Sequence, residues 1–241
     1  MAKLALLLCA CLLVGAATAE FNLLDPSSWV DSLFASTDLE DWEKPDFCGN
    51  SECPPYKLEK RTDNYEIRTY EGGKWVTTEV KDNKYELAYT KATARLIKYF
   101  KGGNDNKTSL ELTTPTLAHL KLDKEGDGTE RDYTFAYWIP PQAQKDTPQP
   151  ADADIKIVDF KEIKVYVRTF SGFATESTIL DNAHSLFDTL KDDDQDFDTD
   201  AVAVAVYDPP QKLIRRHNEV HVVVTDKAQP QKAARAQLAR H

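Results

Sequence analysis

A short pattern near position 67 returns about one hundred positions later in the chain. Residues 67–72 read Ile-Arg-Thr-Tyr-Glu-Gly, and residues 167–172 read Val-Arg-Thr-Phe-Ser-Gly. An internal duplication constrains the fold strongly, because both copies must form the same supersecondary unit. Each copy also contains an alternating, β-branched run, over residues 65–80 and 163–174. We predict that each run forms a strand, a turn and a second strand.

Both copies continue with apolar residues at helical spacing, which predicts one amphipathic helix in each. Two further strand-like runs close each copy, at 109–112 and 133–139 in the first and at 201–207 and 219–225 in the second. We therefore predict an α+β fold of duplicated β-α-β-β units that share one core, with two helices on a largely antiparallel sheet. The residues that carry the two helical patterns are Ala88, Ala92, Leu96, Tyr99 and Phe100, and Ile179, Ala183, Leu186, Phe187 and Leu190.

The amino terminus has the composition of a secretory signal. Lys3 precedes an apolar run over residues 4–14, which is too short to span a bilayer. The run is followed by Ala17-Thr18-Ala19, the small-x-small pattern that signal peptidase requires. We predict a signal peptide over residues 1–19 and a secreted, extracellular chain without a membrane span. An uncleaved membrane anchor is the alternative.

Secretion would expose the remaining cysteines to an oxidising compartment. Cys48 and Cys53 are separated by four residues, and we expect them to close a small disulfide loop. A zinc site would need a second pair of ligands beside them. Asn106 begins an Asn-Lys-Thr sequon, which predicts a glycan in a secreted protein.

Charge and motif spacing argue against several other partners. The formal net charge of −10 disfavours nucleic acid, whose phosphates need a basic face. His217 and His221 lie on a predicted strand, where a rise of about 3.3 Å per residue puts them roughly 13 Å apart, too far to share one ion. The aspartates of 192–200 alternate like a calcium loop. Phe197 and Ala203, however, replace the glycine and the glutamate that an EF-hand needs, so we favour a helix-to-strand loop.

Six sequence blocks stand out along the chain. They are Tyr65-Glu66-Ile67-Arg68-Thr69-Tyr70, Lys74-Trp75-Val76-Thr77-Thr78, Lys98-Tyr99-Phe100-Lys101-Gly102-Gly103-Asn104, Leu112-Thr113-Thr114-Pro115, Tyr207-Asp208-Pro209-Pro210 and Arg216-His217-Asn218-Glu219-Val220. Together these blocks resemble the SOUL, or heme-binding protein, family, and the resemblance covers about residues 55–225 in the family's order. It implies a distorted antiparallel barrel flanked by two helices, and a non-catalytic binder of heme or other tetrapyrroles. We predict a SOUL domain over 55–226, an N-terminal extension over 20–54 that contains the cysteine loop, and a flexible basic tail over 227–241.

The resemblance also implies a ligand groove along the first helix. An apolar wall would cover the faces of the porphyrin, and cations would hold its propionates. Lys98 and Lys212 are the propionate candidates, since Lys212 matches a basic family position at the groove rim. The cofactor-binding residues predicted in this way are Leu96, Ile97, Lys98, Phe100 and Lys212.

Iron ligation is expected to be absent in the family's proposed mode. Some members carry a histidine after the Tyr-Glu-Ile-Arg block, where this chain has Thr69. A threonine hydroxyl is a poor iron ligand, and His119 and His217 are the substitutes that the sequence offers.

Two rival functions are compared with tetrapyrrole binding. The chain could be an extracellular module for another hydrophobic ligand or for a protein partner, with heme binding lost. An enzyme on the same scaffold is disfavoured, because the sequence has no Gly-x-Ser-x-Gly elbow, no His-Glu-x-x-His motif and no phosphate loop.

Overall fold

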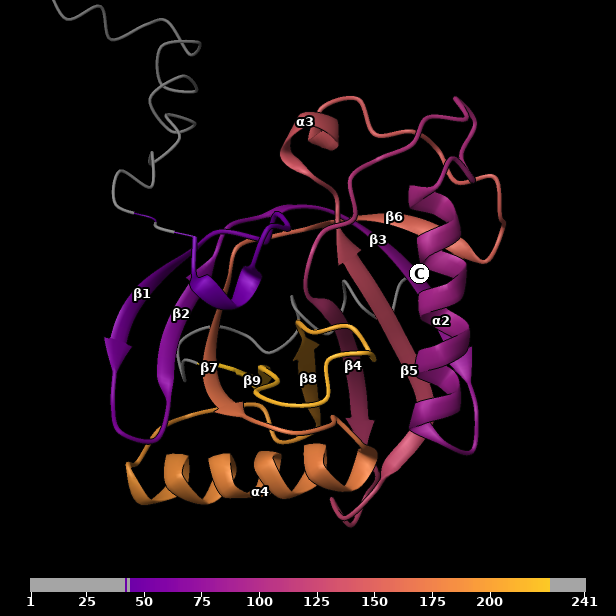
Figure 1. Cartoon of the computed structure of the whole chain (residues 1–241). Coiled ribbons are helices and arrows are strands. Elements are labelled where there is room, and N and C mark those ends of the chain that lie inside the picture. The colour runs from indigo at the N-terminus through magenta and orange to yellow at the C-terminus, as the bar shows by residue number, and fades with distance from the viewer. Residues whose placement is uncertain (1–41, 43, 226–241) are drawn as a thin grey trace, which may run out of the picture. The chain divides into compact units, whose positions relative to one another are not determined.

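The chain forms one curled, antiparallel sheet with two long helices packed against it (Figure 1). The computed structural model describes residue 42 and residues 44–225. Within this part, nine strands are ordered β1-β2-β7-β9-β8-β4-β5-β3-β6, and β1 and β6 are the two edges. The strands are β1 Tyr56–Arg61, β2 Glu66–Tyr70, β3 Gly73–Lys81, β4 Thr116–Leu122, β5 Thr129–Trp138, β6 Ile155–Phe160, β7 Ile163–Phe170, β8 Ala201–Val206 and β9 Asn218–Val223. The helices are η1 Asp46–Cys48, α2 Tyr85–Phe100, α3 Pro141–Gln144 and α4 Glu176–Asp192.

Some predictions concern parts of the chain outside the described residues. These are the signal peptide over 1–19, most of the extension over 20–54 and the basic tail over 227–241. Across the residues that are described, none of the helices has the length and apolar character to cross a membrane.

The duplication is visible as two units of the same topology. The first is β3-α2-β4-β5 and the second is β7-α4-β8-β9. The units meet where β4 pairs with β8, from Thr116 opposite Val206 to Lys121 opposite Ala201. On either side of this seam the order repeats, as β4-β5-β3 and β8-β9-β7. The predicted α+β fold, with duplicated β-α-β-β units and two flanking helices, is confirmed.

One further strand precedes each unit, and each pairs with the other unit. β2 comes before the first unit in the chain but pairs with β7 of the second. β6 comes before the second unit but pairs with β3 of the first. The two units therefore exchange their leading strands.

The repeated hexapeptide does not mark equivalent strands. Residues 67–70 belong to β2 and residues 167–170 to β7, and these strands are neighbours, with Ile67 opposite Tyr166. The topological counterpart of β7 is β3. The second strand predicted within 163–174 is also absent, because Gly172 takes a φ of 86° and Thr175 already caps α4. The similarity of the two hexapeptides therefore reflects two neighbouring strands, β2 and β7, with the same alternating pattern, and not two equivalent positions of the duplication.

The strand predicted at 109–112 is wrong. This segment runs beside the end of α2, where the Leu110 amide donates to the Phe100 carbonyl at 2.8 Å. Further along, the Thr114 amide donates to the Glu52 carbonyl at 2.9 Å. The strand that follows α2 begins only at Thr116, so an alternating tetrapeptide was too short to identify it.

Each helix packs its apolar stripe against its own unit. α2 lies on β3 and β5, while α4 lies on β7 and β9. Figure 1 shows the two helices along different sides of the curled sheet. All ten residues of the two predicted helical patterns are buried, which confirms that 3.6-residue spacing identified the core faces.

Candidate functional site

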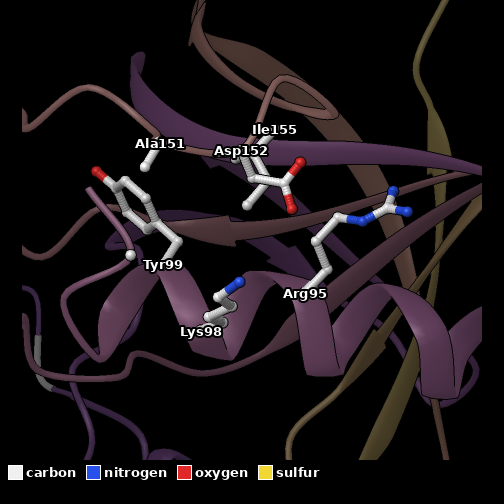
Figure 2. A pocket seen from close by; sticks show the side chains of 7 residues that line it. Arg95, Lys98, Tyr99, Ala151, Asp152 and Ile155 are labelled. Carbon is white, nitrogen blue, oxygen red and sulfur yellow. The ribbon is translucent and has the colours of Figure 1, made fainter. Parts of the chain in front are cut away.

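A pocket of about 250 Å³ lies beside the last two turns of α2 (Figure 2). Its opposite wall is the segment that leads into β6. This volume is slightly below the range of about 300–1,000 Å³ that is typical of small-molecule sites. The lining residues are Arg95, Lys98, Tyr99, Gly103, Ala151, Asp152 and Ile155.

Hydrogen bonds hold the two walls of this pocket together. The Tyr99 hydroxyl donates to the Pro148 carbonyl at 2.8 Å, and the Ala151 amide donates to the Gly103 carbonyl at 3.1 Å. Glycine is needed at 103, because a Cβ there would lie 2.7 Å from the Lys98 carbonyl oxygen. The loop after α2 is thereby fixed against the segment before β6.

Two cationic side chains border the pocket, and they differ in whether they are paired within the protein. Arg95 is committed to the protein, since its guanidinium donates to the Thr78 hydroxyl at 2.8 Å and lies 3.2 Å from an Asp154 oxygen. Lys98 is exposed, and no acidic side chain of the described residues forms an ion pair with its ammonium group. Figure 2 shows both side chains extending from the helix, Lys98 and Arg95 on either side of the Asp152 carboxylate. Lys98 is therefore the cation that a bound anion can engage.

The structure separates the residues of the predicted groove. Leu96 and Phe100 lie in the core, where they face the sheet, and Ile97 is half-buried. Lys98 lines the pocket. Lys212 lies in the loop between β8 and β9 and forms an ion pair with Asp208 at 2.7 Å. Of the predicted apolar wall, only Ile97 is partly open to solvent.

The loop that carries Lys212 faces another side of α2. Within this loop, the Arg216 guanidinium donates to the Lys212 carbonyl at 2.7 Å. Burial raises the pKa of Tyr89, and the nearby charge of Arg216 acts against that rise, so the loop faces Tyr89. Tyr89 and Lys98 are nine positions apart, about half a turn around a helix at about 100° per residue. The loop that carries Lys212 therefore lies on the opposite side of α2 from the Lys98 side chain.

Neither Thr69 nor His119 lies at this pocket. Thr69 is on β2, separated from β5 by four strands, and its hydroxyl donates to a Glu59 oxygen at 2.6 Å. His119 alternates with the buried Ala118 and Leu120 on β4 and so faces away from the helices. Burial lowers the pKa of His119 to about 4, which leaves the imidazole neutral at physiological pH.

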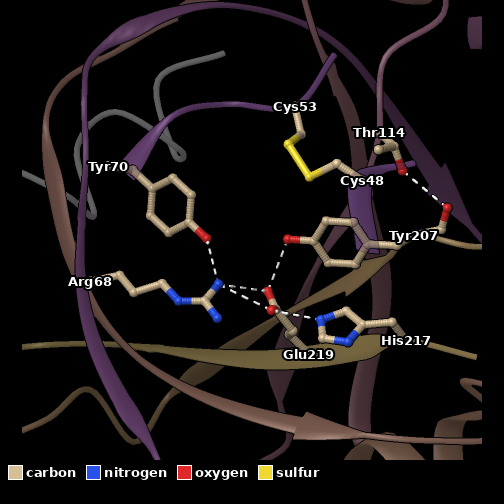
Figure 3. Close-up of a disulfide and its surroundings, with 8 residues drawn as sticks. All are labelled: Cys48, Cys53, Arg68, Tyr70, Thr114, Tyr207, His217 and Glu219. Carbon is tan, nitrogen blue, oxygen red and sulfur yellow. Dashed lines mark hydrogen bonds and ion pairs between the residues drawn. A yellow bond between two sulfur atoms is a disulfide. The ribbon is translucent and has the colours of Figure 1, made fainter. Parts of the chain in front are cut away.

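His217 and His221 both bond the buried carboxylate of Glu219, and Figure 3 shows the contact from His217. The Nε2 atom of His217 is 2.8 Å from one oxygen of Glu219, and the Nε2 atom of His221 is 2.9 Å from the other. These residues alternate along β9 and its entry, so their side chains share one face. Across residues 44–225 no group of three or more His, Cys, Asp or Glu side chains is arranged to hold a metal ion.

Glu219 is the centre of a buried polar cluster that the sequence did not reveal. Its side chain is fully buried, and it accepts from Arg68 at 3.0 Å and from the Tyr207 hydroxyl at 2.9 Å. Arg68 also forms an ion pair with Glu66 at 2.6 Å. Burial acts to raise the pKa of Glu219, but the two histidines and Arg68 outweigh it and hold that pKa well below its usual range. The sequence feature that could have indicated this cluster is Arg68, a charged residue within the alternating pattern of the first hexapeptide.

The predicted disulfide is present and lies next to this cluster. Cys48 and Cys53 are bonded with an S–S distance of 2.10 Å. Phe47, which directly precedes Cys48 in η1, stacks on the His217 ring with centroids 3.9 Å apart. It also meets the Tyr207 ring edge-on at 4.8 Å. The disulfide loop therefore fixes an aromatic cover over the Glu219 cluster.

Two other predicted features lie on loops. The aspartates after α4 form a helix-to-strand loop, in which an Asp193 oxygen accepts from the Tyr65 hydroxyl at 2.9 Å. Asn106 is exposed on the loop that follows the pocket residue Gly103. Glycosylation of Asn106 stays a prediction.

Comparison with known proteins places this fold and these motifs in one family. The model of the SOUL heme-binding protein family matches residues 51–223. This chain belongs to the SOUL heme-binding protein family.

Relatives match over most of their length. The chain is 28% identical to heme-binding protein 2 of Homo sapiens, over 83% of this chain and 92% of that protein. It is 31% identical to heme-binding protein 1 of Mus musculus, over 80% and 96% respectively. Among solved structures, the C-terminal domain of EcmrR aligns with a TM-score of 0.51 at 15% identity, and covers 71% of this chain and 98% of that one. The last likeness shows a shared fold alone.

Proposed function

We propose that this protein is a secreted, non-catalytic binder of heme or a related tetrapyrrole. Support comes from membership of the SOUL heme-binding protein family and from relatives that carry the name heme-binding protein. The observation that carries the proposal within this chain is the α2 pocket, which combines an unpaired lysine with a partly apolar wall. A tetrapyrrole needs both, because it is a flat apolar disc with carboxylates along one edge.

The disc would lie along the open side of α2, with a propionate at Lys98. At about 25 cal/mol per Å² of apolar surface removed from water, covering a few hundred Å² of the ring supplies several kcal/mol. Lys98 would orient the ring by charge. Lys212 is a weaker candidate, because Asp208 already pairs with its ammonium group at 2.7 Å.

The pocket offers no strong axial ligand for iron. Its lining contains no histidine, cysteine or methionine. Tyr99 is present, but its hydroxyl donates to the Pro148 carbonyl, and burial raises its pKa to about 12. Binding would then depend on the shape and charge of the porphyrin rather than on its metal.

Titration of the purified protein with hemin and with iron-free protoporphyrin IX tests this proposal. We expect saturable binding of both with similar Kd values, and a Soret shift too small for strong axial ligation. Absence of saturable binding for both ligands would overturn the proposal and favour the rival function, a module for another hydrophobic ligand or a protein partner. Tight binding of hemin alone would show that a residue ligates the iron. His119→Ala and His217→Ala would then identify it.

The role of Lys98 has a matched control on the other helix. Lys98 is the basic residue in the last turn of α2, and Lys191 is its counterpart in the last turn of α4. We expect Lys98→Glu to raise the Kd for protoporphyrin about tenfold, the effect of about 1.4 kcal/mol, because it places a carboxylate against a propionate. Lys191→Glu should leave the Kd unchanged. Equal Kd values for the two variants would reject Lys98 as a ligand contact, and Lys212→Glu tests the second candidate in the same assay.

Secretion is tested separately from ligand binding. Expression in a secretory host should release a protein that begins at Glu20, which N-terminal sequencing of the medium would show. Treatment with an N-glycosidase should lower its mass, and Asn106→Gln should abolish that change. A chain retained in the cell with residues 1–19 intact would contradict secretion without affecting the ligand titrations.

A further inference from the structure

The loop between β8 and β9 holds two neighbouring aliphatic side chains in solvent. Leu213 and Ile214 are 70% and 75% exposed, the highest values among the large apolar residues of the described chain. Single exposed apolar residues are common on protein surfaces, but adjacent ones on a loop tip mark an interaction site more often. Phe173, itself 49% exposed before α4, contacts the same loop, with its ring centroid 4.7 Å from the Arg216 guanidinium carbon.

This loop is braced rather than loose. The buried Arg216 donates to the carbonyls of Pro209 and Lys212, each at 2.7 Å, and to that of Asp208 at 2.8 Å. The Asp208 carboxylate in turn accepts from the His217 amide at 2.7 Å. Because the backbone is fixed from both sides, the aliphatic pair is presented outward as a preformed tip.

Cations flank the aliphatic pair on both sides. Arg215 follows it, and Lys212, whose ammonium group pairs with Asp208 at 2.7 Å, precedes it. Arg215 is exposed, and no carboxylate within residues 44–225 forms an ion pair with it. The whole chain carries a formal charge of −10, so a positive tip on an acidic protein directs this end toward an anionic surface.

We infer that the 209–216 loop docks on an anionic lipid bilayer. Leu213 and Ile214 would enter the boundary between headgroups and acyl chains, and Phe173 would lie at the edge of the contact. Arg215 would contact the anionic headgroups, and Lys212, already paired with Asp208, would lie beside it as the weaker contact. A bilayer matches this arrangement because it offers negative charge directly above hydrocarbon, in the same order as the cations and aliphatic side chains of the tip. The loop shares Lys212 with the second propionate candidate, but docking on a bilayer does not require tetrapyrrole binding.

A spin label at the tip tests docking locally. The label would be attached to Ile214→Cys in the full chain, with Cys9→Ser and Cys11→Ser to remove other free thiols. When vesicles of phosphatidylcholine and phosphatidylserine are added, we expect the label to become more accessible to oxygen and less accessible to a polar relaxant. The matched label at Leu87→Cys, an exposed leucine on α2, should stay in water. A tip label that remains in water, or two labels that respond alike, would overturn the inference.

Sedimentation with the same vesicles separates the apolar and charged contributions. Replacing both aliphatic residues, in Leu213→Ser with Ile214→Ser, should lower the bound fraction on phosphatidylserine vesicles. Lys212→Gln with Arg215→Gln should weaken the affinity for those vesicles about tenfold and remove the preference over pure phosphatidylcholine. All exchanged side chains are exposed, so thermal unfolding should be unchanged and loss of fold is controlled. Wild-type binding in both variants would contradict docking by this loop, and a protein ligand would then be the better occupant.

Discussion

The two duplicated units differ in the side chains that they place on the face of the sheet opposite the helices. In the first unit this face is covered by an apolar cluster of Trp75, Ala136 and Trp138. In the second it carries the fully buried Glu219 with Arg68 and two histidines. The first unit also has an ion pair between its strands, Lys81 to Asp132 at 3.2 Å, but that pair is exposed to solvent. The same topology therefore supports an apolar cluster in one unit and a buried charge network in the other. Mutations in the two regions should change the unfolding free energy by very different amounts.

The largest effect is expected from removing the buried charge. Glu219→Gln leaves Arg68 without its fully buried partner, which costs about 3–5 kcal/mol of unfolding free energy. Asp132→Asn, its exposed counterpart in the first unit, should cost less than about 1 kcal/mol. Urea unfolding of both variants measures the difference. Losses of similar size would show that burial does not distinguish the two ion pairs.

A double replacement sharpens the same comparison. Arg68→Met with Glu219→Leu removes both charges, so neither is left buried alone, and apolar packing of similar volume often restores stability. We expect this variant to be more stable than Glu219→Gln. If it is less stable, the remaining polar groups of the cluster, among them the Tyr207 hydroxyl, depend on the carboxylate for their own hydrogen bonds.

A pH-dependent effect should arise in the first unit. The pKa of His119 is lowered by burial to about 4, whereas a histidine of the unfolded chain titrates near about 6.5. Between about pH 6.5 and 4, this histidine is protonated in the unfolded chain and neutral in the folded chain. The stabilisation from neutral His119 is thus complete above about pH 6.5 and is lost as the pH falls toward 4, by up to about 3 kcal/mol.

His119→Asn should remove this part of the pH dependence. The measurement is the unfolding free energy of wild type and variant from pH 7 to about 4, where the difference between the two curves isolates one histidine. Curves that stay parallel over this window would show that burial of His119 does not affect stability. Glu219 acts in a separate window. Its lowered pKa gives stability that is present above the pH at which an unfolded glutamate titrates, about 4.3, and is lost only in stronger acid.

The smallest effect concerns the two helix starts. α4 begins with a capping box, in which the side chains of Thr175 and Thr178 each accept from the other's backbone amide. α2 begins after Lys84, whose side chain makes no capping bond. We expect Thr175→Ala to lower the unfolding free energy by about 1 kcal/mol and Lys84→Ala to change it by less. Thermal unfolding would check this, and a larger loss at Lys84 would contradict the assignment of the caps.

The sequence predicted the helices and the class of fold because those depend on local pattern. Residues such as Leu96 and Ile179 recur every three or four positions, and that period alone places them on the buried face. The same period explains why Leu96 and Phe100 lie in the core, while Lys98 lies at the pocket. Expectations that follow from the period of one helix were therefore reliable, whereas two short strands, predicted at 109–112 and within 163–174, are absent.

Features that depend on contacts between distant parts of the chain could not be predicted. Alternation along β9 assigns Glu219 to the face opposite Val220 and Val222, and a charged residue there is expected to meet solvent. It is buried because Phe47 covers the cluster, and because Arg68, 151 positions earlier in the chain, reaches it. No local pattern encodes a partner at that separation. The pocket beside α2 was likewise hidden, since Ala151 and Asp152 come from a connection without periodicity.

The exchange of leading strands has a consequence for how the molecule comes apart. β2 precedes the first unit but is held by the second, and β6 does the reverse. This is the arrangement of a domain swap, made within one polypeptide. Neither half can melt while the other keeps its full sheet, because each would take a strand away from its neighbour. The two copies are separate units in topology, but they are expected to unfold together. Residues 56–223 should therefore unfold in a single transition.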